Sequence, residues 1–504
     1  MNGSKALFNG RRTSICIFSL LNLLLLLFFA DRNGYEGDDL NSILPALHLS
    51  EALKGNLDIY RYDWQPLSYA ISSAIYRLTG TPLAIFLLAP LAASISLALI
   101  LAICLRQLDP RSGLFIPIMA LLAFPEFWFS GLYYNSTILG LPFALGSFLL
   151  LINKSQSSVD RLAAASAAAV LIGIAIFIRI DFVLALPALA VAAWCVDRSV
   201  EKPILFILGV LAVVALAFLT GLLGLDRIME SYRSASSEIS SRSAEPGWDL
   251  RTKLLVISVV LSPVGWIILL LSGPIVLHQS IRRAPLASLA VLFAMIPLVA
   301  PLRHLLSVKY ALPLFMFLPI FMTHCLLTIE QMLRPSSRFI AKLMLATSTV
   351  LQLFLSASFY GKPPYLEIST LASRPIGTHD GTRSYGGYLW QMASVDRWAT
   401  PSKQEIDARS ILNDILHFSG PDFVIVGEEG YFTPGAVGWR HLQLLLEQSG
   451  FRGVLVAPHM LQFNIGSRRL WLLRHLNGKD DLALFERGRG VALYDFRDLG
   501  VLEK

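Results

Sequence analysis

A series of long apolar runs constrains this chain more than any other feature of its sequence. A helix needs roughly 17–25 mostly apolar residues to cross the hydrocarbon layer of a membrane. Charged residues make up only 15% of the 504 residues, whereas a soluble domain carries about 25%. We therefore expect a polytopic α-helical membrane protein. Its expected spans, about eleven, are residues 13–30, 82–105, 113–130, 135–152, 162–178, 181–196, 204–223, 254–277, 285–301, 305–328 and 343–359.

Lysine and arginine placement predicts the orientation of these spans. The first run follows basic residues, as a cleaved signal peptide would, but its apolar core is long and no small-residue cleavage site precedes Asp31, which favours a retained span. With the N-terminus inside, an odd number of spans places the segment from about residue 360 outside. The net charge of +7 then follows from topology and does not require nucleic acid. Each inward-facing connection is basic: Lys5, Arg11, Arg12; Arg106, Arg111; Lys154, Arg161; Arg198, Lys202; Arg282, Arg283; Arg334, Arg338, Lys342.

The cysteines give no support to a disulfide framework. All four (Cys16, Cys104, Cys195 and Cys325) fall within expected spans, and none lies in the predicted outer segment. The chain also lacks the CxxC, HExxH and Walker A patterns, so its motifs indicate no zinc protease and no P-loop nucleotide site.

Residues 31–81 form an outer loop far longer than a connection between spans requires. An adjacent acidic pair, Asp38 and Asp39, opens it. Apolar residues then recur at helical spacing from Leu40 to Lys54, which predicts an amphipathic helix on the membrane surface. The apolar stretch Pro66 to Leu78 is too short to span and is expected to lie in the interface or to re-enter. A second outer piece, 224–253, is serine-rich and charged, and fits either a flap or a plain connector.

The composition of residues 360–504 becomes that of a soluble domain. Apolar stretches predict strands at 423–426, 453–456, 470–473 and 491–494, with a helix from His441 to Gln448 between the first two. We expect a membrane domain over 1–359 and a small α/β outer domain over 360–504. The outer domain contains no catalytic motif, which favours a role as a lid or as a platform that recognises the acceptor.

The order of features in the first hundred residues resembles the opening of the GT-C glycosyltransferase superfamily. A first span is followed by Gly37-Asp38-Asp39, a surface helix, and Tyr62-Asp63-Trp64-Gln65-Pro66-Leu67-Ser68-Tyr69 leading to Arg77-Leu78-Thr79-Gly80. Arg303, Lys309 and Tyr310 before Leu312-Pro313-Leu314 are similar to a late basic and aromatic element of that superfamily. The branch it resembles contains lipid A aminoarabinose transferases, galacturonosyltransferases and protein O-mannosyltransferases.

Two departures from that branch concern the donor and the acceptor. Trp64-Gln65-Pro66 stands where the branch often carries Lys-Pro-Pro, and Tyr133-Tyr134-Asn135 stands where its second outer loop often offers an acidic residue. The resemblance implies a membrane enzyme that takes a sugar from a polyprenyl-phosphate donor. It leaves the identity of sugar and acceptor open.

Such a transfer needs a base that removes the acceptor's proton, and an outer-loop carboxylate suits that role. The resemblance assigns it to Asp38 or Asp39. The alternative is N-capping of the helix that begins near Leu40, which favours aspartate at that place and explains one carboxylate more easily than two.

The charge of the departing phosphate also needs stabilisation, which cationic side chains supply through charge-assisted hydrogen bonds. Arg303, His304, Lys309 and Tyr310 flank the outer start of the tenth expected span, where they fit either phosphate binding or ordinary anchoring at the interface. Further substrate-binding candidates are Trp64, Gln65 and Arg179. We expect Arg179 to pair with Asp181 in a tight outer turn between the fifth and sixth spans. Glu36 and Asp63 stand near enough to Asp38 in sequence to hold a divalent cation with it, but nothing in the spacing demands one.

The leading hypothesis is an inverting glycosyltransferase in a bacterial-type inner membrane. It would use a polyprenyl-phosphate-linked donor and an outer glycan, lipid or protein acceptor. A transporter or flippase of a lipid-linked saccharide is the alternative, but no repeat relates the two halves and the 31–81 loop has no counterpart. A non-catalytic scaffold that presents residues 360–504 is the third possibility.

Overall fold

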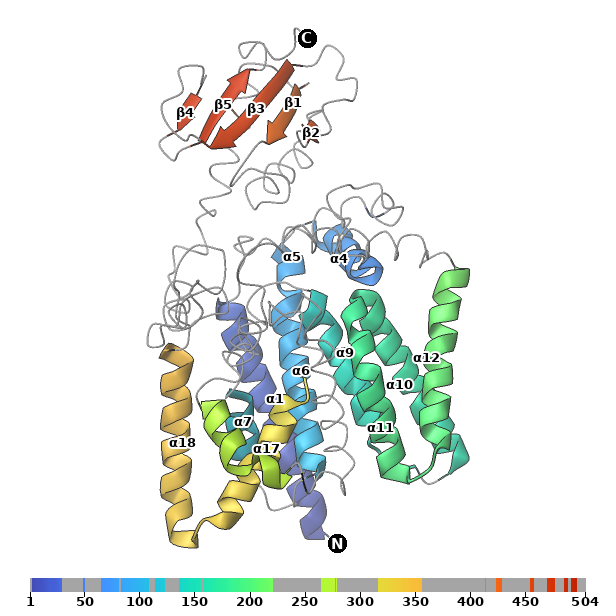
Figure 1. The fold of residues 1–504 in the computed structure, drawn as a ribbon, viewed down its shortest axis with the longest axis vertical. Helices are drawn as coiled ribbons and strands as arrows, with labels where there is room; N and C mark the ends of the chain where they lie inside the picture. Colours follow the sequence, from blue (N-terminus) through green and yellow to red (C-terminus); the bar gives the residue numbers. More distant parts are fainter. Residues whose placement is uncertain are drawn as a thin grey trace. The chain divides into compact units, whose positions relative to one another are not determined.

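The computed structural model describes most of the membrane part and the strands near the C-terminus. The described residues are 2–29, 49, 65–80, 83–107, 114–122, 136–155, 157–220, 264–276, 278, 316–355, 413, 423–427, 454–456, 469–475, 485–487 and 491–495. They belong to two compact units, one containing α1 and the helices from α6 to α18, the other containing most of α4, α5 and a β-sheet (Figure 1).

The first unit is a bundle of apolar helices. Its elements are α1 (Asn2–Phe29), α6 (Leu88–Gln107), α7 (Phe115–Leu122), α9 (Ser136–Leu151), α10 (Ser158–Ile178), the 3₁₀ helix η2 (Ile180–Ala185), α11 (Leu186–Asp197), α12 (Glu201–Leu219), α17 (Leu318–Met332) and α18 (Pro335–Leu355). Residues 264–276 form a further apolar helix. The mostly helical, multi-span character expected from the sequence is confirmed.

Four described helices are long and apolar enough to cross a membrane: Leu88–Arg106, Ser158–Ile178, Ile180–Asp197 and Glu201–Leu219. Their positions agree with the runs expected at 82–105, 162–178, 181–196 and 204–223. The run at 285–301 lies outside the described residues, and those at 113–130, 254–277 and 305–328 are described in part. The total of eleven spans therefore stays a prediction.

Local sequence explains where these helices begin and end. Ser157 and Asp160 form a capping box at the start of α10, in which the Ser157 hydroxyl accepts from the Asp160 amide at 3.1 Å and the Ser157 amide donates to the Asp160 carboxylate at 3.1 Å. The run expected at 82–105 contains a break: α5 (Leu83–Phe86) ends before α6 begins at Leu88. Pro90 accounts for this break, because a proline ring clashes with the carbonyl four residues earlier, here that of Phe86.

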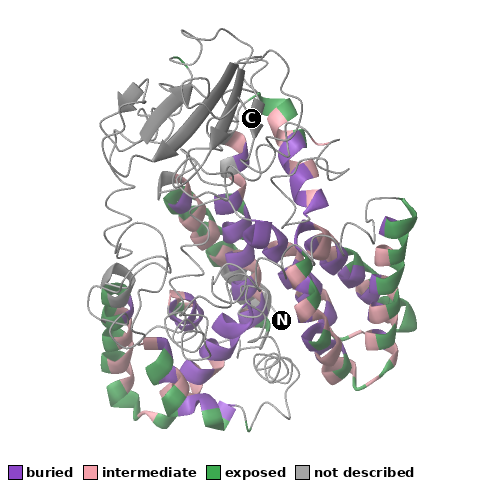
Figure 2. Ribbon diagram, turned by 45° about the horizontal axis from the view of Figure 1, so that its top comes forward, coloured by how far each residue is buried: buried purple, intermediate pink, exposed green. Residues whose placement is uncertain are grey.

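Helix α9 lies in the middle of the bundle, in contact with α6, α10 and α11, while α1 packs on α6 and α17 packs on α7. Figure 2 shows buried residues concentrated on the central helices, whereas α12 and α18 are exposed over much of their surface. Two contacts join segments far apart in the sequence. The side-chain Nδ2 of Asn22 donates to the Ser94 hydroxyl at 3.0 Å, and the ring centroids of Phe148 and Phe317 lie 4.5 Å apart.

Small residues allow α10 and α12 to approach closely. A Cβ atom on Gly173 would lie 2.6 Å from Val213 Cγ1, and one on Gly209 would lie 2.8 Å from Ala169 Cβ. Small residues at helix contacts are the usual means of association in a membrane, because lipid provides no hydrophobic driving force between helices.

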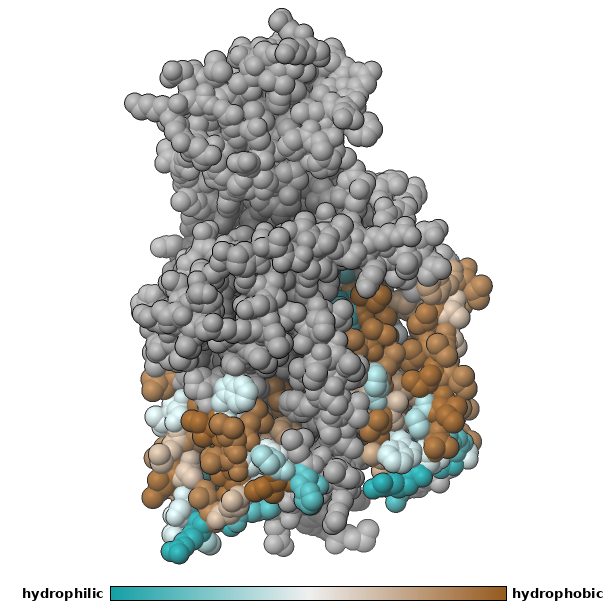
Figure 3. Space-filling model, in the orientation of Figure 1, coloured by the Kyte–Doolittle hydropathy of each residue, from teal (hydrophilic) through white to brown (hydrophobic). Residues whose placement is uncertain are grey.

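The outer sides of the bundle are apolar. Figure 3 shows hydrophobic surface over the sides of the described helices and hydrophilic residues along their lower edge. This pattern fits helices whose sides face lipid and whose ends face water. Exposed apolar side chains include Ile204, Leu208, Leu211 and Leu216 on α12, and Phe339, Ile340, Leu343 and Met344 on α18.

The short apolar stretch that follows Gln65 forms helix α4 (Pro66–Thr79), and its expected place in the membrane interface stays a prediction. It begins with Pro66, which suits the first helical position. It ends at Gly80, which has a positive φ of 68° and whose amide donates to the Tyr76 carbonyl at 2.7 Å. With 14 residues it is too short to span.

The second unit contains a mixed five-stranded sheet of order β2-β1-β3-β5-β4. Its strands are β1 (Phe423–Gly427), β2 (Val454–Val456), β3 (Arg469–His475), β4 (Phe485–Arg487) and β5 (Val491–Asp495). Strand β1 runs parallel to β2 and β3, and β5 runs antiparallel to β3 and β4. The four predicted strands are confirmed, β4 was missed, and the helix expected at 441–448 lies outside the described residues. The extent of an α/β domain over 360–504 stays a prediction.

Candidate functional site

Arg179 forms the turn between α10 and η2. Its backbone is extended, with φ −156° and ψ 122°, and this ends α10 while the Arg179 amide still donates to the Ala175 carbonyl at 2.8 Å. Asp181 follows in the first turn of η2. A cation at the C-terminus of one helix and an anion at the N-terminus of the next are both favoured by the helix dipoles.

The Arg179 guanidinium has hydrogen-bond partners on two different elements, η2 and α9. Its Nε donates to Asp181 Oδ2 at 2.6 Å, and its Nη1 donates to Ser136 Oγ at 3.2 Å. The side chain of Arg179 is 7% exposed and that of Asp181 is 19% exposed. The predicted Arg179–Asp181 pair and the tight turn that contains it are confirmed.

The start of α9 lies directly beside this turn. Ser136 is the first residue of α9, and a Cβ atom on Gly140, one helical turn later, would overlap the ring of Phe182 in η2. Close packing of α9 against η2 therefore fixes the turn in place. We call Ser136, Arg179 and Asp181 the Arg179 cluster. A fixed guanidinium in such a cluster is able to bind an oxyanion.

Gln65 is the other predicted site residue within the described structure. It is 8% exposed and stands immediately before Pro66, the first residue of α4. The remaining predicted site residues lie outside the described residues, so their mutual placement stays a prediction: Asp38, Asp39, Trp64, Arg303, His304, Lys309 and Tyr310.

The described residues contain no group of three or more histidine, cysteine, aspartate or glutamate side chains able to hold a metal ion. The possible cation ligands Glu36, Asp38 and Asp63 fall outside that search, so a divalent cation is left unassigned.

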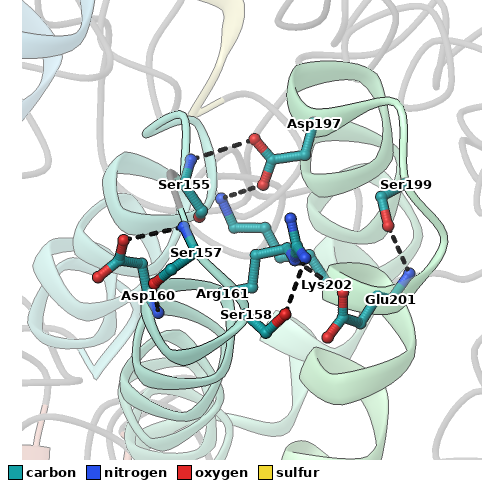
Figure 4. Close-up of polar contacts among 9 residues, drawn as sticks. All are labelled: Ser155, Ser157, Ser158, Asp160, Arg161, Asp197, Ser199, Glu201 and Lys202. Atoms are coloured by element: carbon teal, nitrogen blue, oxygen red, sulfur yellow. Dashed lines mark hydrogen bonds and ion pairs between the residues drawn. The ribbon is translucent and has the colours of Figure 1, made fainter.

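The opposite end of the bundle carries a second polar cluster (Figure 4). The sequence indicated its lysine and arginine residues only as markers of the orientation of the spans. Lys202 is fully buried, and its Nζ donates to the Leu151 carbonyl at 2.9 Å and the Asn153 carbonyl at 2.6 Å. It also lies 3.3 Å from Asp197 Oδ2. The other carboxylate oxygen of Asp197 accepts from the Ser155 amide at 3.2 Å. We call Ser155, Asp197 and Lys202, with the two carbonyls, the Lys202 cluster.

Two further contacts bring basic residues to this end. Arg161 Nε lies 2.7 Å from Glu201 Oε2, and the Arg106 guanidinium donates to the Asn153 side chain. The α17–α18 connection and the start of α1 are drawn at the same end (Figure 1). The expected basic connections that the structure describes therefore gather at one end of the bundle. Which face of the membrane this end occupies stays a prediction.

The fold and these two polar ends define a polytopic helical membrane protein with an oxyanion-binding candidate opposite its basic end. No family model and no curated protein matches the chain by sequence. Its structure is similar to that of ArnT from Cupriavidus metallidurans in the apo state, with a TM-score of 0.57 and 13% identity over 95% of this chain and 97% of that one. The structure of ArnT from Cupriavidus metallidurans bound to undecaprenyl phosphate is similar too. Its TM-score is 0.53, with 11% identity over 92% of this chain and 93% of that one.

At such low identity the similarity establishes the fold alone. ArnT has the GT-C fold, so the resemblance inferred from the sequence is confirmed at that level.

Proposed function

We propose that this chain is a membrane glycosyltransferase that moves a sugar from a polyprenyl-phosphate-linked donor to an acceptor outside the cytoplasm. The observation that carries the proposal is the fold shared with ArnT over almost the full length of both chains. The undecaprenyl phosphate bound to ArnT in one structure supports the lipid phosphate as the donor's leaving group. The N-terminus is then cytoplasmic and residues 360–504 lie outside, in a bacterial-type inner membrane.

In the proposed reaction, Asp38 or Asp39 accepts the proton of an acceptor hydroxyl as its oxygen attacks the anomeric carbon of the sugar. The new bond forms between that oxygen and the anomeric carbon, and the bond from the anomeric carbon to the phosphate oxygen breaks. Polyprenyl phosphate leaves with the electron pair, and a single displacement inverts the anomeric configuration. A carboxylate is suited to this proton transfer.

The departing phosphate needs donors that stabilise its charge in a site from which water is excluded. We assign this role to Arg303, Lys309 and Arg179, with His304 and Tyr310 nearby in the sequence. Arg179 supports the assignment because it is a buried, paired guanidinium at the end of α10 opposite the Ser157 capping box. Trp64 and Gln65 are assigned to the sugar, for which a flat aromatic face and an amide are suitable partners.

Lipid and glycan profiling of a strain that lacks the protein tests the function. We expect one sugar to be missing from an outer glycan, lipid or protein, and its polyprenyl-phosphate donor to accumulate. Accumulated donor identifies the sugar for a direct assay with purified protein. Movement of a lipid-linked saccharide across vesicle membranes without sugar transfer would instead support the transporter hypothesis. If the protein showed neither activity, the non-catalytic scaffold would be the remaining hypothesis.

Complementation of that strain tests the base. At least one of Asp38→Asn and Asp39→Asn should abolish transfer while the protein inserts at the wild-type level. Asp58→Asn, which neutralises another carboxylate of the same loop, is the matched control and should restore sugar transfer to the strain. If both Asp38→Asn and Asp39→Asn transferred sugar at the wild-type rate, the assignment of the base would be wrong.

A further inference from the structure

We propose that Asp181 is a positioning residue, which together with Ser136 orients the Arg179 guanidinium toward the phosphate of the lipid donor. The inference rests on the proposed function, because it assumes a phosphate-linked donor. It goes beyond that function by assigning roles to Asp181 and Ser136, neither of which touches the reacting atoms in this scheme.

Contacts at two nitrogens fix the plane of the guanidinium. Asp181 accepts from Nε and Ser136 accepts from Nη1, and these partners lie on different elements, η2 and α9. An arginine held at one nitrogen still rotates about its terminal bonds, whereas one held at two is confined to one orientation. Preorganised donors stabilise developing charge because little reorganisation is needed when the charge appears.

The ion pair with Asp181 also offsets the energetic cost of burying the Arg179 cation beside the start of α9. An unpaired buried charge is strongly unfavourable, and the nearby N-terminus of α9 carries a partial positive charge that repels Arg179 further. Asp181 compensates both effects. The Arg179 cluster therefore keeps the side chain charged and in place before any ligand arrives.

The Lys202 cluster shows what a closed pair looks like in the same bundle. Lys202 and Asp197 have side-chain exposures of 0% and 3%, and the Lys202 ammonium has three oxygen partners within the protein. Arg179 and Asp181 are 7% and 19% exposed, so their pair reaches the end of the bundle. The fully buried Lys202 pair fits a purely structural role, whereas the partial exposure of Asp181 fits a pair that lies within reach of a ligand.

The start of α9, where Ser136 contacts Arg179, carries further polar groups. Thr137 follows Ser136 and is 1% exposed, and its hydroxyl has no hydrogen-bond partner among the residues that the structure describes. Backbone amides at a helix N-terminus favour anions, and a phosphate is the anion that the proposed donor carries. These groups and the guanidinium together form the expected phosphate environment.

The test measures phosphate binding apart from stability. Purified Asp181→Asn and Ser136→Ala proteins are titrated with undecaprenyl phosphate in detergent, and their thermal unfolding is followed in parallel. Each substitution should weaken binding about tenfold, the effect of losing one well-placed charge-assisted contact. Ser136→Ala should unfold near the wild-type temperature, whereas Asp181→Asn, which leaves the buried Arg179 without its carboxylate, should unfold at a lower temperature. Asp181→Glu, which keeps the charge, and Ser136→Thr, which keeps the hydroxyl, should recover part of the affinity.

Asp197→Asn at the opposite end is the matched control. It should lower the unfolding temperature and leave the affinity for undecaprenyl phosphate unchanged. Where Asp181→Asn does not fold, Ser136→Ala alone decides the outcome. With the donor identified, the Asp181→Asn protein should show both a higher KM and a lower kcat, because the oriented guanidinium contacts the phosphate in the ground state and stabilises the further charge that develops on it in the transition state.

The possible results separate this inference from the proposed function. Lower stability with unchanged affinity in both Asp181→Asn and Ser136→Ala would make the cluster structural and overturn the inference, while the wild type continued to transfer sugar. A wild-type protein that neither bound undecaprenyl phosphate nor used any polyprenyl-phosphate donor would overturn both.

Discussion

Lys202 Nζ lies 3.3 Å from Asp197 Oδ2, between two side chains that are 0% and 3% exposed. The two residues belong to the end of α11 and the start of α12, and the carbonyls of Leu151 and Asn153 at the end of α9 complete the ammonium's partners. One buried cation thus joins three helix ends. Beside it, the ion pair between Arg161 and Glu201 joins the start of α10 to the start of α12 (Figure 4).

We predict that Lys202→Met strongly destabilises the bundle. The substitution leaves the Asp197 carboxylate buried without its cation, and removal of one partner from a buried pair costs about 3–5 kcal/mol. Equilibrium unfolding in mixed detergent micelles measures the loss. Arg161→Gln is the control, because the Arg161–Glu201 pair is 24% and 42% exposed and an exposed pair contributes about 0–1 kcal/mol. Equal losses in the two variants would show that burial of the Lys202 pair has no energetic consequence.

The close approach of α10 and α12 leads to a second prediction. Gly173→Ala places a Cβ atom 2.6 Å from Val213 Cγ1, so the helices must shift. Overpacking of this kind costs about 1–3 kcal/mol. Thermal unfolding of the purified protein should therefore show a clear decrease in stability.

Gly273→Ala is the matched control for that substitution. It lies in the helix 264–276, where, among the residues that the structure describes, a Cβ atom would approach Leu269 alone, at 3.9 Å, which is ordinary contact. Alanine is the better helix former, so this variant should be at least as stable as the wild type. The packing argument fails if Gly173→Ala and Gly273→Ala unfold at the same temperature.

The features that could be predicted from the sequence are those that depend on residues near one another in the chain. Apolar runs indicate spans by composition alone, and Arg179 and Asp181 are only two residues apart, so their pairing was predictable. The strands β1, β2, β3 and β5 were predictable because each contains a continuous apolar run.

What could not be predicted depends on distant contacts or on short segments. Nothing near Lys202 indicates that it is buried, since its carbonyl partners lie about fifty residues earlier. Ser136 as a partner of Arg179 is likewise a contact between residues 43 positions apart. Strand β4 has three residues, of which two are charged, and depends on its pairing with β5. Asp38 and Asp39 rest on the resemblance alone.

The proposed orientation predicts opposite labelling of two ends of the chain. Val200, in the α11–α12 connection, is 63% exposed and belongs to the end with the basic residues. In a variant whose four cysteines are replaced by serine, a cysteine at Val200 should react with a membrane-impermeant maleimide only in inside-out vesicles. A cysteine added after Lys504 should react only in right-side-out cells. Labelling of both from the same side would contradict an outer C-terminus.

The cations before the tenth expected span give the last prediction, which concerns the donor. Neutralisation of Arg303 or Lys309 in Arg303→Gln and Lys309→Gln should raise the donor KM about tenfold each, because each removes one charge-assisted contact to the phosphate. Arg334→Gln provides the control. Arg334 lies in the connection between α17 and α18, on the expected cytoplasmic side, and its loss should leave KM unchanged. Steady-state transfer assays at several donor concentrations separate KM from kcat. If Arg303 and Lys309 serve only to anchor the span at the interface, all three variants will have the wild-type KM, and the phosphate-binding role will pass to Arg179 alone.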